Sequence, residues 1–134
     1  MYAPDSFDNV EVLRVGVTGP SGANTLFIVS GVALLHFQGT GTDWHRDDLS
    51  FVLPGEGTGN PAALDIGAGF VDSVVAAFPA TIQSTSGQDV GWGIDTVDTT
   101  VEGNHIRVVA RTVVRNPAGV ILRMGFHVSV LSHV

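Results

Sequence analysis

The alternation of apolar and polar residues near the C-terminus constrains the fold of this chain more than any other feature. Every second side chain from Ile106 to Val114 and from Leu122 to Val130 is apolar, except for Thr112. A period of two is typical of β-strands that bury one face. Between the two runs, Asn116-Pro117-Ala118-Gly119 places proline and glycine as in a type I turn. We therefore expect an antiparallel hairpin, closed by a positive φ at Gly119.

This turn implies a specific register. With Val114 opposite Leu122, the apolar residues of both arms share one face, and a shift of one residue would break that agreement. Upstream, Gly103-Asn104 suits a two-residue turn that places Val101 opposite Ile106. The C-terminal region is thus predicted to form a three-stranded antiparallel meander.

The rest of the chain consists of short apolar runs separated by glycine- and proline-rich turns. The run Thr25–Phe37 is predicted to be a strand buried on both faces and bent at Gly31, with a buried helix as the alternative. Residues 62–78 remain open between strand and helix, and Pro79 places the strand after it at the edge or start of a sheet. Further expected segments are strands over 9–18, 49–53, 80–85 and 90–94, a polar loop over 38–48 and a turn over 86–89.

About eight or nine short strands with regular turns predict one all-β domain over residues 1–134. The fold class is an antiparallel β-sandwich or jelly-roll-like fold, with an open barrel as the second choice. Residues 1–8 are expected to form an extended N-terminal arm that lies across a neighbouring subunit, or else a simple tail.

Composition limits the function. The chain has no cysteine, which excludes disulfides and thiolate metal sites, and its net charge of −7 disfavours nucleic acid. No apolar run reaches the roughly 20 residues of a membrane-spanning helix, and no signal peptide is visible at the start. With 44% hydrophobic and 14% charged residues, much of the surface is expected to be buried against partners, most simply in a homo-oligomer.

Charge is divided unevenly along the chain. All 13 acidic residues precede Asn104, whereas four of the six basic residues follow it, and all six are arginine. On the predicted meander these four arginines share an outer face with His105 and His127. They are expected either to pair with acids of the same chain or to bind an acidic surface of another subunit. The residues assigned to this assembly interface are Arg107, Arg111, Arg123 and His127.

Two tryptophans and one polar cluster are the candidates for ligand binding. Trp44 and Trp92 both have aspartates nearby, as in sites that stack and hydrogen-bond a sugar, although each could instead plug one end of the sandwich. His45 and Asp47 form an H-x-D pair, which with a distant histidine would compose an iron site. No second motif for such an enzyme is present, so no cofactor, bound metal or catalytic residue is predicted.

The run Phe78-Pro79-Ala80-Thr81-Ile82, followed by alternating strands, resembles one segment of the H-type lectin sandwich. The resemblance assigns no residue roles in this chain. The first functional hypothesis is a non-catalytic structural module that self-associates, as in a virion or another surface assembly. The alternatives are a lectin-like module that binds glycans and a small metal-dependent enzyme that uses His45 and Asp47.

Overall fold

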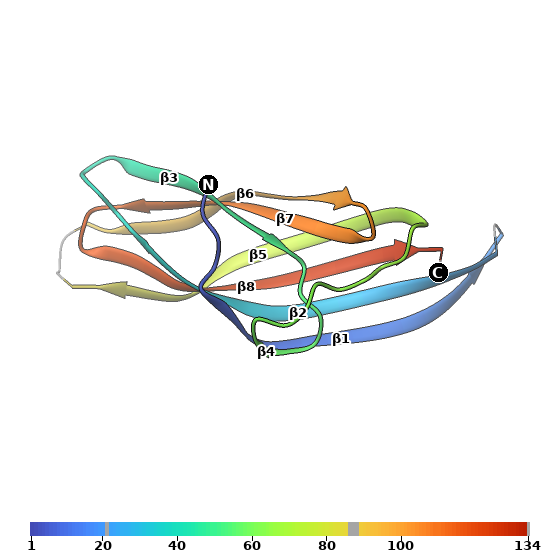
Figure 1. Cartoon of the computed structure of the whole chain (residues 1–134). Helices are drawn as coiled ribbons and strands as arrows, with labels where there is room; N and C mark the ends of the chain where they lie inside the picture. The colour runs from blue at the N-terminus through green and yellow to red at the C-terminus, as the bar shows by residue number, and fades with distance from the viewer. Residues whose placement is uncertain (21, 86–88, 134) are drawn as a thin grey trace.

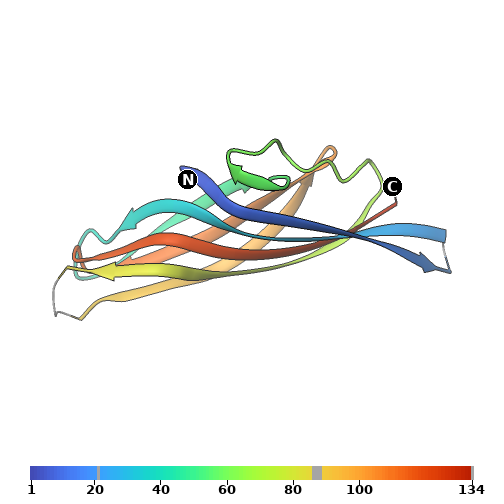
Figure 2. The same ribbon diagram turned by 90° about the horizontal axis from the view of Figure 1, so that it is seen from below.

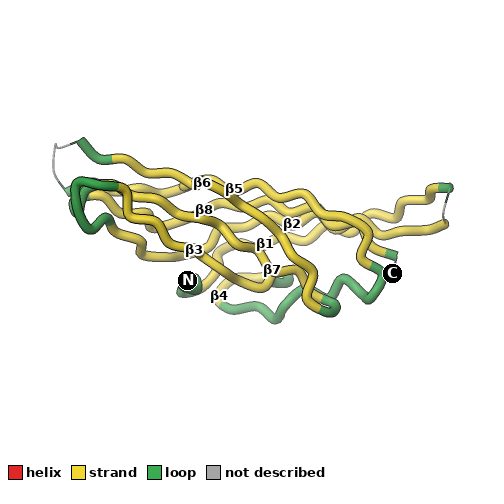
Figure 3. Tube along the Cα trace, turned by 90° about the horizontal axis from the view of Figure 1, so that it is seen from above, coloured by secondary structure: helices red, strands yellow, loops and turns green. Residues whose placement is uncertain are grey.

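The computed structural model of the protein describes residues 1–20, 22–85 and 89–133. These residues form two stacked antiparallel sheets joined by loops (Figures 1 and 3). One sheet has five strands in the order β4-β1-β2-β8-β5, and the other has three in the order β3-β7-β6. The predicted all-β antiparallel sandwich is therefore confirmed. The strands are β1 (Ser6–Gly19), β2 (Gly22–Gln38), β3 (Trp44–Val52), β4 (Gly57–Gly59), β5 (Phe70–Ser84), β6 (Gly91–Glu102), β7 (His105–Arg115) and β8 (Gly119–Ser132).

The predicted C-terminal hairpin, and with it the three-stranded meander, is wrong, because β7 and β8 belong to different sheets. The turn between them is present, and the Gly119 N–H donates to the Asn116 carbonyl at 3.0 Å. It carries the chain across the sandwich instead of back along the same sheet. The positive φ of 82° belongs to Asn116 and not to Gly119. Gly119 instead leaves room for Val90, whose side chain would lie 2.3 Å from an added Cβ.

Alternation alone does not distinguish the two arrangements. In a hairpin the apolar residues of both strands point the same way from one sheet, whereas in the sandwich they point at one another from two sheets. Either way the same residues are buried. A bulge where β8 meets β5 also moves the buried position from Leu122 to Ile121. The buried residues of the two strands include Ile106, Val108, Val114, Met124, Phe126 and Val128.

The other predicted hairpin is confirmed. β6 and β7 pair with Val101 opposite Ile106, and Gly103 in the turn has a φ of 59°. That backbone conformation favours glycine, which explains why the Gly103-Asn104 dipeptide forms this turn, whereas a residue with a Cβ at position 103 would be strained.

β2 is one continuous strand over the apolar run, so the helix alternative is wrong. The expected bend at Gly31 lies instead on the neighbouring strand. Asn9 and Val10 of β1 together oppose Gly31, and Asn9 takes the positive φ (53°) that this bulge requires. Gly31 accommodates the bulge, since an added Cβ would lie 2.9 Å from the Val10 side chain.

Other element boundaries differ from expectation. β3 begins at Trp44, inside the predicted polar loop, and β5 spans most of the uncertain region as one strand. Pro79 lies within β5, which is an edge strand of the five-stranded sheet and so tolerates a residue without an N–H. The predicted turn at 86–89 falls mostly on residues outside those that the structure describes.

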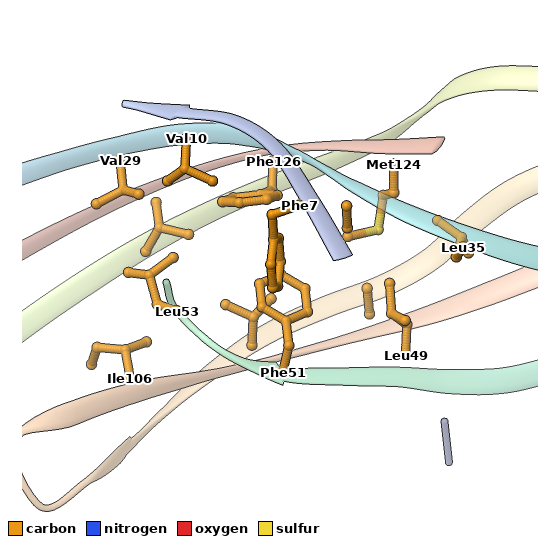
Figure 4. Packing of buried hydrophobic residues seen from close by; sticks show 14 of the residues in the cluster. Phe7, Val10, Val29, Leu35, Leu49, Phe51, Leu53, Ile106, Met124 and Phe126 are labelled. Carbon is orange, nitrogen blue, oxygen red and sulfur yellow. The ribbon is translucent and has the colours of Figure 1, made fainter. Parts of the chain in front are cut away.

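Three phenylalanines form the centre of the core, between the two sheets (Figure 4). Phe51 of β3 lies 5.2 Å from Phe7 of β1 and 5.3 Å from Phe126 of β8, measured between ring centroids. Aliphatic side chains from both sheets surround this cluster. Those labelled in Figure 4 are Val10, Val29, Leu35, Leu49, Leu53, Ile106 and Met124.

The N-terminal residues lie on their own chain. The Tyr2 N–H donates to the Asp48 carbonyl at 2.9 Å, and the Ser50 N–H donates to the Tyr2 carbonyl at 2.8 Å. Residue 2 thus extends the edge of β3, and from Ser6 the chain continues as β1. The expected arm over 1–8 is therefore part of the sandwich, and these contacts do not require a neighbouring subunit.

Candidate interaction surface

Trp44 lies on the outer face of the three-stranded sheet, directly opposite Arg115. A Cβ at Gly91 would lie 2.4 Å from its ring, so the ring crosses β7 to reach β6. The Arg115 guanidinium lies 5.2 Å from the ring centroid and donates to Asp89 at 2.9 Å. Beside this group is a hollow of about 270 Å³, lined by Thr42, Asp89, Arg115 and Asn116.

Trp92 faces the other way. It lies opposite Val114, packs against the core, and its buried Nε1 finds no acceptor among the described residues. Trp44 and Trp92 therefore do not form one site. The position of Trp92 matches the expected plug, whereas Trp44 remains available as part of a polar surface.

The His45–Asp47 pair is engaged in local contacts. The His45 ring stacks on Phe37 with centroids 4.8 Å apart, and Phe37 stacks in turn on Tyr2 at 5.4 Å. An Asp47 carboxylate oxygen lies 2.6 Å from the Met1 amino group, whose hydrogen bond holds the pKa of Asp47 below its usual value. Across the described ranges no three His, Cys, Asp or Glu side chains gather into a metal-binding group.

Tyr2 is linked to β7 and β3 through two consecutive hydrogen bonds at Thr112. Its hydroxyl lies 2.7 Å from Thr112 Oγ1, which donates to the Asp47 carbonyl at 3.0 Å. Since the threonine proton is used toward Asp47, the tyrosine hydroxyl is the donor to Thr112. Burial raises the pKa of Tyr2 to about 12, and the nearby Asp47 charge adds to the shift.

The predicted arginine face is divided. Arg107 and Arg111 lie on β7 in the three-stranded sheet, whereas Arg123 and His127 lie on β8 in the other sheet. The expectation of a single basic face is therefore wrong, because it depended on pairing β7 with β8. Because β7 and β8 belong to different sheets, these residues lie on opposite sides of the sandwich. Their role in assembly stays a prediction.

Arginines of β7 are paired within the chain. Arg107 forms an ion pair with Glu102 and donates to Ser50 Oγ at 2.9 Å, and Arg111 lies 3.1 Å from an Asp48 oxygen. These acids belong to the acidic part of the chain. The contacts fit the expectation that the arginines pack against acids of the same molecule.

The outer face of the five-stranded sheet carries several exposed apolar side chains. One row across the sheet runs from Leu13 through Ile28 and Ser129 to Val74, and the next runs from Val15 through Leu26 and Leu131 to Asp72. Val74 is 71% exposed and Leu13 58%. We call this set the outer band: Leu13, Val15 and Val17 of β1, Leu26 and Ile28 of β2, Leu131 of β8 and Val74 of β5.

The far end of β1 and β2 extends beyond the rest of the sandwich (Figures 1 and 2). Pairing between β2 and β8 begins at Thr25, which lies opposite Gly16 of β1, so among the described residues 17–19 and 22–24 have no third strand. β4 pairs with β1 only at Phe7 and Val10. The described chain therefore leaves the outer edge of β1 without a neighbour from Glu11 to Gly19, and we call this stretch the free edge.

Alternation places Leu13, Val15 and Val17 on one face of the strand expected over 9–18, without showing whether another element covers that face. The structure exposes these three side chains because no described element covers the outer side of the five-stranded sheet where β1 projects. A signal was present in the sequence: residues 15–42 contain no Asp, Glu, Lys or Arg. This uncharged stretch is longer than one buried strand requires.

Comparisons with known proteins do not assign the chain to a family: no family model, no curated protein and no solved structure matches it. The resemblance of residues 78–82 to the H-type lectin sandwich thus gains no support. In the part of the chain that the structure describes, no helix is long and apolar enough to cross a membrane.

Proposed function

We propose that this protein is a non-catalytic structural module that self-associates, of the kind that builds virions or other surface assemblies. The observation that carries the proposal is the outer band, a group of exposed and half-buried apolar side chains on four strands of one sheet face. Large contiguous apolar patches on soluble proteins are typical of interaction sites. The free edge beside the band adds backbone groups able to pair with another strand.

A matched pair of valines tests this proposal. Val74, which is 71% exposed, belongs to the outer band, whereas Val101, which is 46% exposed, lies on the three-stranded sheet. We expect Val74→Asp to lower the sedimentation coefficient of the wild-type assembly and Val101→Asp to leave it unchanged. Equal effects of the two substitutions, or none from Val74→Asp, would contradict a role for the band.

The hypothesis that Arg107 and Arg111 form the assembly interface can be tested in the same experiment. Reversing Arg107 and Arg111 to Glu breaks their intramolecular pairs with Glu102 and Asp48. If assembly depended on the basic surface, the double variant would be monomeric with unchanged β-sheet circular dichroism. An assembly carried by the outer band persists in this variant.

A second candidate function, glycan binding, is favoured by the hollow beside Trp44. Carboxylate, guanidinium and amide groups around an aromatic ring are the contacts that sugars use, and Asp89, Arg115 and Asn116 supply them here. The Arg115 guanidinium already lies over the ring, so a stacked sugar would have to displace it or bind beside it. Titration of a sugar panel, followed by tryptophan fluorescence, tests this: a response that disappears in Trp44→Phe supports it, and no response from any sugar removes it.

A further inference from the structure

The free edge of β1 has defined limits at both ends. At one end β4 occupies the edge as far as Val10, which pairs with Gly57. At the other end Pro20 follows the closing pair Gly19–Gly22 and has no N–H to offer a ladder. A partner strand thus has room for the residues between these limits.

This edge has a single inward charge, Arg14, as protection against pairing with another strand. Natural edges carry lysines, prolines, inward charges or bulges that prevent pairing with another chain. From Val12 to Thr18 the only charged residue is Arg14, the register with β2 is regular, and no proline interrupts it. The edge is therefore open to strand addition.

Backbone geometry restricts which residues can pair. Gly19 and Gly22 are the closing pair of the β1–β2 ladder and are separated by two residues in the sequence, so they and every second residue along β1 direct their backbone groups toward β2. The intervening residues Val12, Arg14, Gly16 and Thr18 direct theirs toward the free edge. Two antiparallel copies of β1 can therefore pair only in registers that set these residues opposite one another.

One of these registers suits two copies of the same strand. With Val15 opposite Val15 of the partner subunit, Leu13 faces the partner's Val17 on the outer side, and Arg14 faces the partner's Gly16 on the inner side. The glycine leaves space for the long arginine side chain, since nothing lies within 4 Å of an added Cβ there. The neighbouring register, centred on Arg14, would set two like charges directly opposite each other.

Space beside the start of the free edge, near Glu11, can receive the Gly19 end of the partner subunit's β1. A hollow of about 410 Å³ is lined by Glu11, Val12, Leu13, Ile28, Ser30 and Glu56. In the register centred on Val15, the partner's Val17, Thr18 and Gly19 lie opposite Leu13, Val12 and Glu11. The Gly19 end of each β1 thus lies beside the hollow of the other molecule.

We infer that two copies of this chain associate by antiparallel pairing of their β1 free edges about a two-fold axis at Val15. This inference rests on the proposed self-association and specifies its geometry. Pairing joins the two five-stranded sheets edge to edge. The two outer bands then become one continuous apolar surface, available to further assembly.

Single-cysteine variants test the register, because the natural chain has no cysteine. Facing residues in antiparallel strands have Cα atoms about 4.5–5.5 Å apart, within the range of a disulfide. Under mild oxidation we expect most of Val15→Cys to become a covalent dimer. Val17→Cys should remain uncrosslinked, because its two copies would be offset by several residues, about 13 Å along the strands.

The outcomes separate the inference from the function on which it rests. An oligomeric wild type in which Val15→Cys does not crosslink, or in which Val17→Cys crosslinks equally, overturns the register but leaves self-association intact. A wild type that is monomeric at all concentrations overturns both. Selective crosslinking of Val15→Cys supports both.

Discussion

Tyr2 offers the sharpest single prediction, because it titrates alone. It is the only tyrosine, and the chain has neither cysteine nor lysine, so no other side chain ordinarily ionises between about pH 8.5 and pH 12. Burial beside Thr112 raises its pKa from 10.0 to about 12. The absorbance of tyrosinate at 295 nm therefore reports this one hydroxyl.

The shift has a consequence for stability. Folding favours the protonated phenol, so the stabilisation is complete below pH 10 and is lost as the pH rises through 12. At pH 11 the two pKa values give a loss of about 1.4 kcal/mol relative to pH 9, and the limit above pH 12 is about 2.7 kcal/mol. Both are upper bounds, because the Tyr2 ring is only partly buried and solvent screens the effect.

Two measurements check this reasoning. Spectrophotometric titration of the folded protein should give a midpoint near pH 12, and the urea-unfolded chain should give one near pH 10. Urea unfolding at pH 9 and pH 11 should show the loss in the wild type and a smaller loss in Tyr2→Phe. A folded midpoint near pH 10 would refute the proposed burial of Tyr2 against the edge of β3.

Three further predictions concern packing, a tight contact and the turn between the sheets. Phe126→Ala should lower the free energy of unfolding by about 3–5 kcal/mol in urea titrations, because it removes the ring between the two sheets. Gly39→Ala should lower the melting temperature, since its Cβ would lie 2.2 Å from the Asn116 carbonyl oxygen, whereas Gly41→Ala has open space and should not. Asn116→Ala should cost about 1–2 kcal/mol, because it forces alanine into a positive φ and removes the side-chain acceptor for the Ala118 N–H at 3.0 Å; equal stability to wild type would show that the turn rearranges.

Local chemistry explains what the sequence could predict. The Gly103-Asn104 turn fixed the β6–β7 register because its loop length and its backbone requirement agree on one pairing. Pro79 predicted a strand at the edge or start of a sheet, because a residue without an N–H is tolerated there, and β5 is an edge strand. These features depend on residues close together in the chain.

Arrangements between distant strands were not predictable in the same way. Alternation in β7 and β8 fits one sheet or two, and only the packing of β2 and β5 against β8 decides between them. The arginine surface was misplaced for that reason. The outer band was missed because periodicity identifies an apolar face without showing whether another element covers it.

The mass of the wild-type protein in solution tests the central claim most directly. Native mass spectrometry and light scattering over a range of concentrations should show a dimer or larger assembly, formed through the outer band and the free edge. A monomer at every concentration would contradict self-association and would direct attention to the hollow beside Trp44.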